Sequence, residues 1–267
     1  MDCDFVDINL GCPIDLIFKK GMGSGLMNRE KPLEVMIRSM SQILTRPLTV
    51  KMRTGIHMNK KIAHELIPHV KEWGADLVTL HGRSREQRYK LLADWSYAGD
   101  CKKAVDQDFP IYGNGDILSY EDYIASKAVS GVDGVMLARG ALIKPWIFTE
   151  IKEQRHWDIS AQERLDMIRD YANYGMEHWG SDAKGIESTR RFLLEWLSFL
   201  HRYVPYGLLE RPPQKINQRL PPYRGRSDLE TLLSSPACSD WISITEMFLG
   251  KVPDGFSFEP KHKAHSY

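Results

Sequence analysis

The stretch Val6-Asp7-Ile8-Asn9-Leu10-Gly11-Cys12-Pro13 (VDINLGCP) decides the fold class of this chain. Apolar residues at positions 6, 8 and 10 alternate with polar ones, which is the pattern of a strand with one buried face. Gly11 and Pro13 then turn the chain and leave Cys12 at the corner. A buried strand that ends in a polar loop is typical of α/β proteins, whose functional sites lie at the carboxyl ends of their strands.

Short apolar runs of the same kind recur along the first half of the chain. With the first strand they span residues 5–10, 47–52, 76–80, 109–112 and 132–137. Between them, the segments 31–44 and 60–74 have apolar residues spaced by three and four, which predicts amphipathic helices, with Gly74 as a C-terminal stop. Strands that alternate with helices predict a parallel sheet with covering helices.

Polar or glycine-containing residues follow each of these strands. Successive strand ends that all carry site chemistry favour a (β/α)₈ TIM barrel over a doubly wound sheet, which gathers its ligand at one switch point. We interpret the strands as strands four to eight of an incomplete barrel, and expect the chain to be a truncated form or a fragment. Residues 1–150 are predicted to form this partial barrel. Residues 151–267 are predicted to form an all-helical domain, because 160–180, 186–204 and 239–250 have helical periodicity.

The composition excludes several classes of protein. Apolar residues make up 42% and charged residues 27% of the 267 positions, the balance of a globular protein with a substantial core. No apolar run approaches the roughly 18 residues of a membrane span, and the sequence has no signal-peptide pattern, so we expect an intracellular protein. The net charge of +1 limits any nucleic-acid contact to local patches. The four cysteines lack CxxC or metal-ligand spacing, so neither a disulfide framework nor a structural metal is expected.

Side chains at the predicted strand ends are the candidate functional groups. Cys12 is either a small buried hydrophobe or, if the corner presents it to a pocket, a nucleophile or general acid. Lys51 is either a solvated lysine or a point charge that stabilises an anionic ring or a phosphate. His81 and Arg83 repeat this arrangement one strand later. Two adjacent strand ends that together carry Lys, His and Arg favour a binding site over coincidence.

Two of three glycine-containing stretches are candidate phosphate loops. GNGD (113–116) and ARG (138–140) follow the last two strands, where their glycines allow an anion to approach the backbone and Arg139 can bind it with two hydrogen bonds. GMGSGL (21–26) fits neither the dinucleotide nor the P-loop spacing. We predict that it is a flexible loop of the active site.

The motifs DINLGCP, VKMRTG, LHGRSREQRY, LADW, GNGDI and LARGALIKPWIF, in that order, resemble the flavin-dependent tRNA-dihydrouridine synthases. The segments GCPIDLIFKKGMGSGLMNR and FTEIKEQRHWDIS are similar to those of a eukaryotic branch that reduces a uridine in the tRNA variable loop. The resemblance extends from about residue 4 to the C-terminus. It implies a (β/α)₈ barrel that binds FMN, NADPH as the reductant, and a helical domain that helps to hold tRNA. Messenger RNA stays open as a further substrate.

The resemblance also implies a role for each candidate residue. Cys12 would donate a proton to C5 of the uracil after reduced FMN has passed hydride to C6. Lys51 and His81 would contact the flavin ring. The ribityl phosphate would be held by Asn114, Gly115, Asp116, Ala138 and Arg139. Asn9 would lie beside the uracil, and we predict that Arg53 and Arg83 also bind the substrate.

The predicted helical domain is rich in basic and aromatic residues. These are Arg190, Arg191, Arg202, Arg211, Lys215, Arg219, Arg224 and Arg226, with Tyr203, Tyr206 and Tyr223 among them. Such a set can neutralise phosphates and stack on unpaired bases, although a solvated helix face with an exposed linker has the same composition. Two other functions stay open. One is an FMN barrel oxidoreductase acting on a small pyrimidine, which tRNA binding would exclude. The other is a non-catalytic RNA-binding fragment, which bound flavin would exclude.

Overall fold

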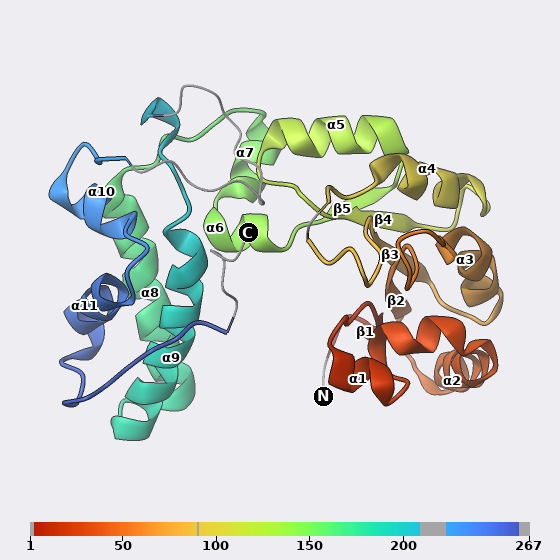
Figure 1. The fold of residues 1–267 in the computed structure, drawn as a ribbon, viewed down its shortest axis with the longest axis horizontal. Coiled ribbons are helices and arrows are strands. Elements are labelled where there is room, and N and C mark those ends of the chain that lie inside the picture. Colours follow the sequence, from red (N-terminus) through yellow and green to blue (C-terminus); the bar gives the residue numbers. More distant parts are fainter. Residues whose placement is uncertain (1–2, 90, 209–222, 262–267) are drawn as a thin grey trace. The chain divides into compact units, whose positions relative to one another are not determined.

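The computed structural model describes residues 3–89, 91–208 and 223–261, which form two compact units (Figure 1). The first unit is Met1–Ala138 and the second is Arg139–Tyr267. The division therefore falls earlier than the expected boundary at residue 150. Two short helices before residue 154, α6 (Arg139–Ile143) and α7 (Ile147–Glu153), belong to the second unit.

The first unit contains a five-stranded parallel sheet with the strand order β1-β2-β3-β4-β5. The strands are β1 (Val6–Leu10), β2 (Leu48–Arg53), β3 (Leu77–His81), β4 (Ile111–Asn114) and β5 (Gly134–Met136). All the predicted strands are thus confirmed, as is the parallel α/β class. Within the described residues β1 and β5 each pair with one strand only, so the sheet is open.

The helices of the first unit connect successive strands of the sheet along the chain. They are α1 (Asp15–Lys19), the 3₁₀ helix η1 (Gly23–Asn28), α2 (Glu30–Ile43), α3 (Ala63–Glu72), α4 (Trp95–Lys103) and α5 (Tyr120–Ser130). Their apolar periodicity predicted α2 and α3. Instead of long apolar stripes, α4 and α5 have N-caps: the Asp94 and Ser119 side chains accept hydrogen bonds from the backbone of Tyr97 and Asp122.

The prediction that residues 21–26 form a flexible loop is wrong. Most of this stretch lies in η1, where Gly23, Ser24 and Gly25 are buried. The Ser24 hydroxyl donates a hydrogen bond to the carbonyl oxygen of Cys12 at 2.8 Å. The glycines are therefore small enough to pack η1 against the end of β1, and the segment is part of the folded unit.

The sheet has an apolar face and a polar face, because successive residues of a strand point in opposite directions. Ile8, Val50, Val78 and Ile111 join buried side chains of α2, α3 and α4 in one hydrophobic core. Burial of each such aliphatic side chain contributes ~1.5–3 kcal/mol. The intervening residues, from Asp7 and Asn9 on β1 to Asn114 on β4, then occupy the other face. Packing of the core thereby orients the polar side chains of the site.

The described residues of the second unit form helices joined by loops, with no strand among them, in agreement with the predicted helical domain. After α6 and α7 come α8 (Ala161–Trp179), α9 (Ala183–Leu200), the 3₁₀ helix η2 (Tyr206–Leu208), α10 (Asp228–Leu233) and α11 (Cys238–Leu249). The indole nitrogen of Trp196 on α9 donates to the carbonyl of Leu142 at 2.9 Å, which ties α6 to this unit. None of the helices in the described ranges is both long and apolar enough to cross a membrane.

Candidate functional site

Cys12 lies in a turn whose backbone is held by three side chains. Asn9 Oδ1 accepts hydrogen bonds from the backbone N–H groups of Gly11 (2.9 Å) and Cys12 (3.0 Å). Arg53 Nε donates to the carbonyl of Gly11 at 2.7 Å, while the Ser24 hydroxyl and N–H both donate to the carbonyl of Cys12. Asparagine stabilises turns by such local side-chain hydrogen bonds. Cys12 is thus a half-buried free thiol on a fixed backbone.

Lys51 and Asn114 connect β2 to β4 across the polar face of the sheet. Lys51 Nζ donates to Asn114 Oδ1 at 3.3 Å, and Asn114 Nδ2 donates to the carbonyl of Met136 at 2.7 Å. Burial lowers the pKa of Lys51, and the charge of Arg53 lowers it further, while Asp7 opposes both. In the described part of the chain no carboxylate forms an ion pair with Lys51. The lysine therefore supplies a half-buried cation whose hydrogen-bond partner is a neutral amide.

The two arginines predicted to bind substrate are buried and use their donors within the protein. Arg53 is 3% exposed and donates to the carbonyls of Gly11 and Ser84, the latter at 3.0 Å. Burial lowers the pKa of Arg53, and a hydrogen bond with Tyr89 raises it. Arg83 is fully buried and makes an ion pair with Asp116. In this structure both guanidinium groups connect loops of the protein.

Residues 114–116 make a tight turn at the end of β4. Gly115 (φ +133°) and Asp116 (φ +59°) both have positive φ. Only glycine fits at position 115, because a Cβ there would lie 2.6 Å from that of Ala93. Trp95 Nε1 donates to the Gly115 carbonyl at 3.1 Å, and the Ala93 N–H donates to Asp116 Oδ2 at 2.7 Å. The segment after β3 therefore fixes the turn after β4.

The structure brings most of the predicted site residues to one edge of the sheet. Strand register pairs Asn9 with Lys51 and pairs His81 with both Arg53 and Asn114. Ala138 ends the first unit, whereas Arg139 begins α6 in the second, so the edge described here consists of residues from the first unit. Among the residues that the structure describes, no three His, Cys, Asp or Glu side chains form a group that could hold a metal ion.

Three contributors to this edge were not assigned a role from the sequence. The ring centroid of Tyr89 lies 6.5 Å from that of His81. The Arg83 guanidinium carbon lies 5.9 Å from the Tyr89 ring centroid in a cation–π contact. Trp95 holds Gly115, and Ser24 holds Cys12. Tyr89 and Trp95 end the motifs LHGRSREQRY and LADW, which are the signals that point to them. Ser24 has no comparable signal, since its contact depends on how η1 packs.

The predicted basic surface of the second unit is in part wrong. Arg190 and Arg202 are buried, and Arg190 donates to the Thr245 hydroxyl (2.7 Å) and to the carbonyls of Leu249 and Gly250. Arg190 therefore joins α9 to the end of α11. Arg191 and Arg224 are exposed, and Arg191 pairs with Glu187 on its own helix. The remaining predicted residues Arg211, Lys215 and Arg219 lie outside the described residues.

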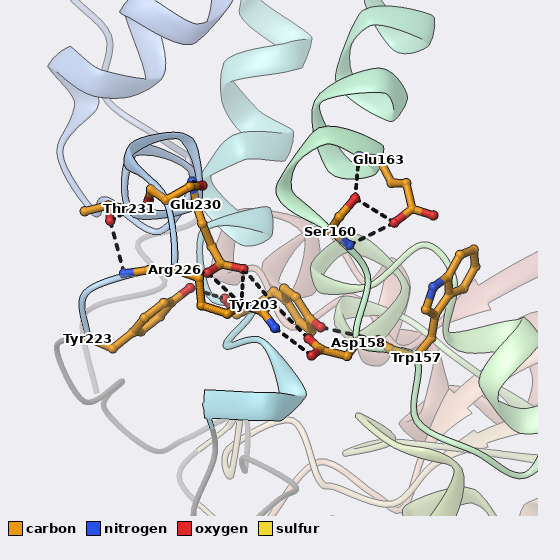
Figure 2. A network of polar contacts seen from close by, with 11 residues as sticks. Trp157, Asp158, Ser160, Glu163, Tyr203, Tyr223, Arg226, Glu230 and Thr231 are labelled. Carbon is orange, nitrogen blue, oxygen red and sulfur yellow. Dashed lines mark hydrogen bonds and ion pairs between the residues drawn. The ribbon is translucent and has the colours of Figure 1, made fainter.

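Arg226 belongs to a polar network in the second unit, shown in Figure 2. Its guanidinium group donates to Asp158 Oδ2 and to Glu230 Oε1, both at 2.7 Å. The Tyr223 hydroxyl donates to the Tyr203 carbonyl at 3.1 Å. The Tyr203 hydroxyl donates to the backbone carbonyl of Trp157 at 3.4 Å. These contacts join segments far apart in the sequence, so Arg226 and Tyr203 stabilise the fold of this unit.

The carboxylate of Glu230 predicts a pH dependence of stability. The hydrogen bonds from Arg226 hold its pKa below the usual 4.5, so the ionised form favours the folded state. This stabilisation is complete above pH 4.5 and is lost as the pH falls through the lower pKa of the folded state. We expect Glu230→Gln to be less stable than the wild type at pH 7, with the difference shrinking towards pH 3, as measured by urea unfolding. Glu177→Gln, at an exposed position of α8, is the control; a difference that stays constant with pH contradicts the assignment.

Together, the fold and the site define an α/β protein with polar side chains gathered at the carboxyl edge of a parallel sheet. The family model described as Dihydrouridine synthase (Dus) matches residues 1–199. The chain belongs to the dihydrouridine synthase family, as its motifs indicated.

Curated relatives agree with this assignment over the full chain. The sequence is 62% identical over 268 residues to tRNA-dihydrouridine(47) synthase [NAD(P)(+)]-like of Xenopus tropicalis and to the protein of the same name of Homo sapiens. It is 51% identical over 267 residues to the Oryza sativa subsp. japonica protein of that name. These alignments cover 99–100% of this chain and 42%, 41% and 39% of the three relatives. The chain thus spans about two fifths of the length of these relatives.

Proposed function

We propose that this chain acts in the reduction of a uridine of the tRNA variable loop to 5,6-dihydrouridine, with FMN as cofactor and NADPH as reductant. Membership of the dihydrouridine synthase family supports the reaction, and the names of the relatives support tRNA and an NAD(P) coenzyme. The observation that carries the proposal is the fixed Cys12 turn at the same sheet edge as Lys51 and His81. Messenger RNA is a further candidate substrate.

The proposed architecture assigns a task to each unit. The five parallel strands would be strands four to eight of a (β/α)₈ barrel, and the first unit would bind FMN and the reacting uracil. The helical second unit would contact tRNA. Arg191 and Arg224, which are exposed, are the described members of the predicted basic set that suit phosphate contacts. A tRNA substrate would make the site of action intracellular.

The chemistry of the residues at the sheet edge fits FMN. The half-buried ammonium group of Lys51, whose hydrogen-bond partner is the neutral amide of Asn114, can stabilise negative charge on a flavin ring. His81, which is a neighbour of Asn114 in the strand register, suits a contact with the same ring system. The turn of residues 114–116 and Ala138, all in the first unit, would form the phosphate end of the site. When bound, FMN supplies hydride for C6 of the uracil.

Cys12 would supply the proton that completes the reaction at C5 of the uracil. Addition of hydride at C6 leaves negative charge at C5 and its conjugated carbonyl. The reaction therefore requires a group that donates a proton to C5. A thiol is a suitable donor at neutral pH, because free cysteine has a pKa of about 8.5. Asn9, Ser24 and Arg53 would keep the thiol in place, which limits the reorganisation needed before proton transfer.

The proposed reaction is tested with an unmodified tRNA transcript. The chain, supplied with FMN and NADPH, is expected to form dihydrouridine at the variable-loop uridine, measured by nucleoside mass spectrometry. A transcript with cytidine at that position is the matched control. Reduction of free uracil or uridine without reduction of tRNA would instead identify a small-pyrimidine oxidoreductase. Binding of tRNA without any flavin would identify an RNA-binding fragment.

A further inference from the structure

Arg83 and Asp116 form a buried ion pair between the loops that follow β3 and β4. Arg83 Nη2 lies 2.7 Å from Asp116 Oδ1 and 2.6 Å from Oδ2. Arg83 Nε donates to the Leu91 carbonyl at 2.6 Å, and Asp116 Oδ2 also accepts the Ala93 N–H. The Arg83 side chain is 0% exposed and that of Asp116 is 15% exposed. Both side chains are therefore engaged by the protein itself.

These contacts do not suit direct binding of an anion by either residue. An ionised carboxylate has only acceptors, so Asp116 cannot donate a hydrogen bond to a phosphate and would repel it. Arg83 neutralises that negative charge. The guanidinium directs two of its nitrogens to Asp116 and the Leu91 carbonyl, and a third lies 3.5 Å from His81 Nε2. Arg83 is thus enclosed by protein groups on several sides.

The ion pair acts instead on the backbone. Asp116 has φ +59°, a left-handed conformation that is strained for a residue with a side chain. Its carboxylate, held by Arg83 and by the Ala93 N–H, stabilises this conformation. Gly115 precedes it in the same turn and is held through its carbonyl by Trp95. The turn of residues 114–116 therefore has one conformation imposed from the β3 side.

We propose that Arg83 and Asp116 are positioning residues, whose buried ion pair holds the turn of residues 114–116 in the conformation that receives the phosphate of FMN. Neither side chain contacts the ligand. This reassigns both residues from direct contacts and rests on the proposed binding of FMN. Arg83 reaches the Asp116 carboxylate through Nη2 and the Leu91 carbonyl through Nε at the same time, a fixed geometry that a lysine ammonium does not reproduce, so the identity of Arg83 matters as well as its charge.

The test compares FMN with riboflavin, which has the same ring system without the phosphate. Dissociation constants of both are measured by flavin fluorescence for the wild-type chain, Asp116→Asn and Arg83→Lys. We expect each variant to bind FMN about tenfold more weakly or worse, a change of ~1.4 kcal/mol or more. Riboflavin affinity should change by less than about twofold, because Lys51 lies on β2 and its partner Asn114 is held separately by the Met136 carbonyl.

Asp133→Asn is the matched control. Asp133 also pairs with a basic residue, Lys102 at 2.8 Å, and accepts a backbone N–H, that of Ile111 at 2.8 Å. Ile111 begins β4 and Asp133 directly precedes β5, so this pair lies at the opposite edge of the same sheet. A loss of FMN affinity caused by general destabilisation of the unit would appear in this control too.

Each outcome decides between positioning and its alternatives. Equal weakening of FMN and riboflavin would show a general structural role and overturn the proposal. Unchanged FMN affinity in both variants would overturn it while leaving the proposed function intact, and tighter FMN binding by Asp116→Asn would show that the carboxylate faces the phosphate directly. If one variant fails to fold, judged by circular dichroism, the other decides. A wild-type chain that binds neither flavin overturns the proposed function and this inference together.

Discussion

Cys12→Ala is expected to lower the rate of dihydrouridine formation by about 10²–10⁴-fold, the usual contribution of a general acid. The variant loses the proposed proton donor for C5. Its backbone hydrogen bonds with Asn9 and Ser24 need no side chain at position 12, so the turn should persist. FMN affinity should match that of the wild type. The measurement is single-turnover reduction of the tRNA transcript by the prereduced protein.

Two further variants define what a loss of rate would mean. Cys12→Ser replaces the thiol with a hydroxyl of similar size, which is a far weaker acid, so this variant should also be slow. Cys238→Ala removes a half-buried thiol on α11 in the other unit and should leave the rate unchanged. Retention of the wild-type rate by Cys12→Ala would reject the proton-donor role.

Trp241→Ala is expected to lower the free energy of unfolding by about 3–5 kcal/mol, the usual cost of removing a buried tryptophan. Trp241 on α11 is 1% exposed. Its indole nitrogen donates to the Ser235 carbonyl at 2.7 Å, and its ring centroid lies 5.2 Å from that of His201. The variant leaves a cavity and an unpaired carbonyl. Urea unfolding followed by circular dichroism measures the loss.

The same helix offers a control for this prediction. Met247 is 51% exposed, so Met247→Ala should change the free energy of unfolding by less than about 0.5 kcal/mol. A similarly small effect of Trp241→Ala would contradict the position of α11 in the core of the second unit. Such a result would also weaken the assignment of Arg190 to the α9–α11 contact, because both residues join the same pair of helices.

The sequence predicted those parts of the fold that have a strong local pattern. Alternation in β1 separates the buried side chains of Ile8 and Leu10 from the exposed Asp7 and Asn9, and it correctly predicted the polar face. Helices α2 and α9 have long apolar stripes and were also predicted. By contrast, α1 has no buried residue, so no apolar stripe marks it.

The roles of the charged residues were harder to predict, because composition does not report burial. Arg190 lies in an amphipathic helix and could be assigned to a basic surface, but the structure places it on the buried side. Arg83 and Asp116 are 33 residues apart in the sequence, and only the parallel pairing of β3 with β4 brings them together. Long-range partners of this kind decide whether an arginine contacts a ligand or supports the protein.

Direct titration of the purified 267-residue chain with FMN tests whether the polar edge of this sheet forms a flavin site. Flavin fluorescence and visible absorbance are followed as the protein concentration rises. We expect saturable binding of FMN, with a perturbed flavin absorbance spectrum in the bound state. Flavin fluorescence and absorbance that stay unchanged up to high protein concentration, with a folded and monodisperse protein, would contradict it.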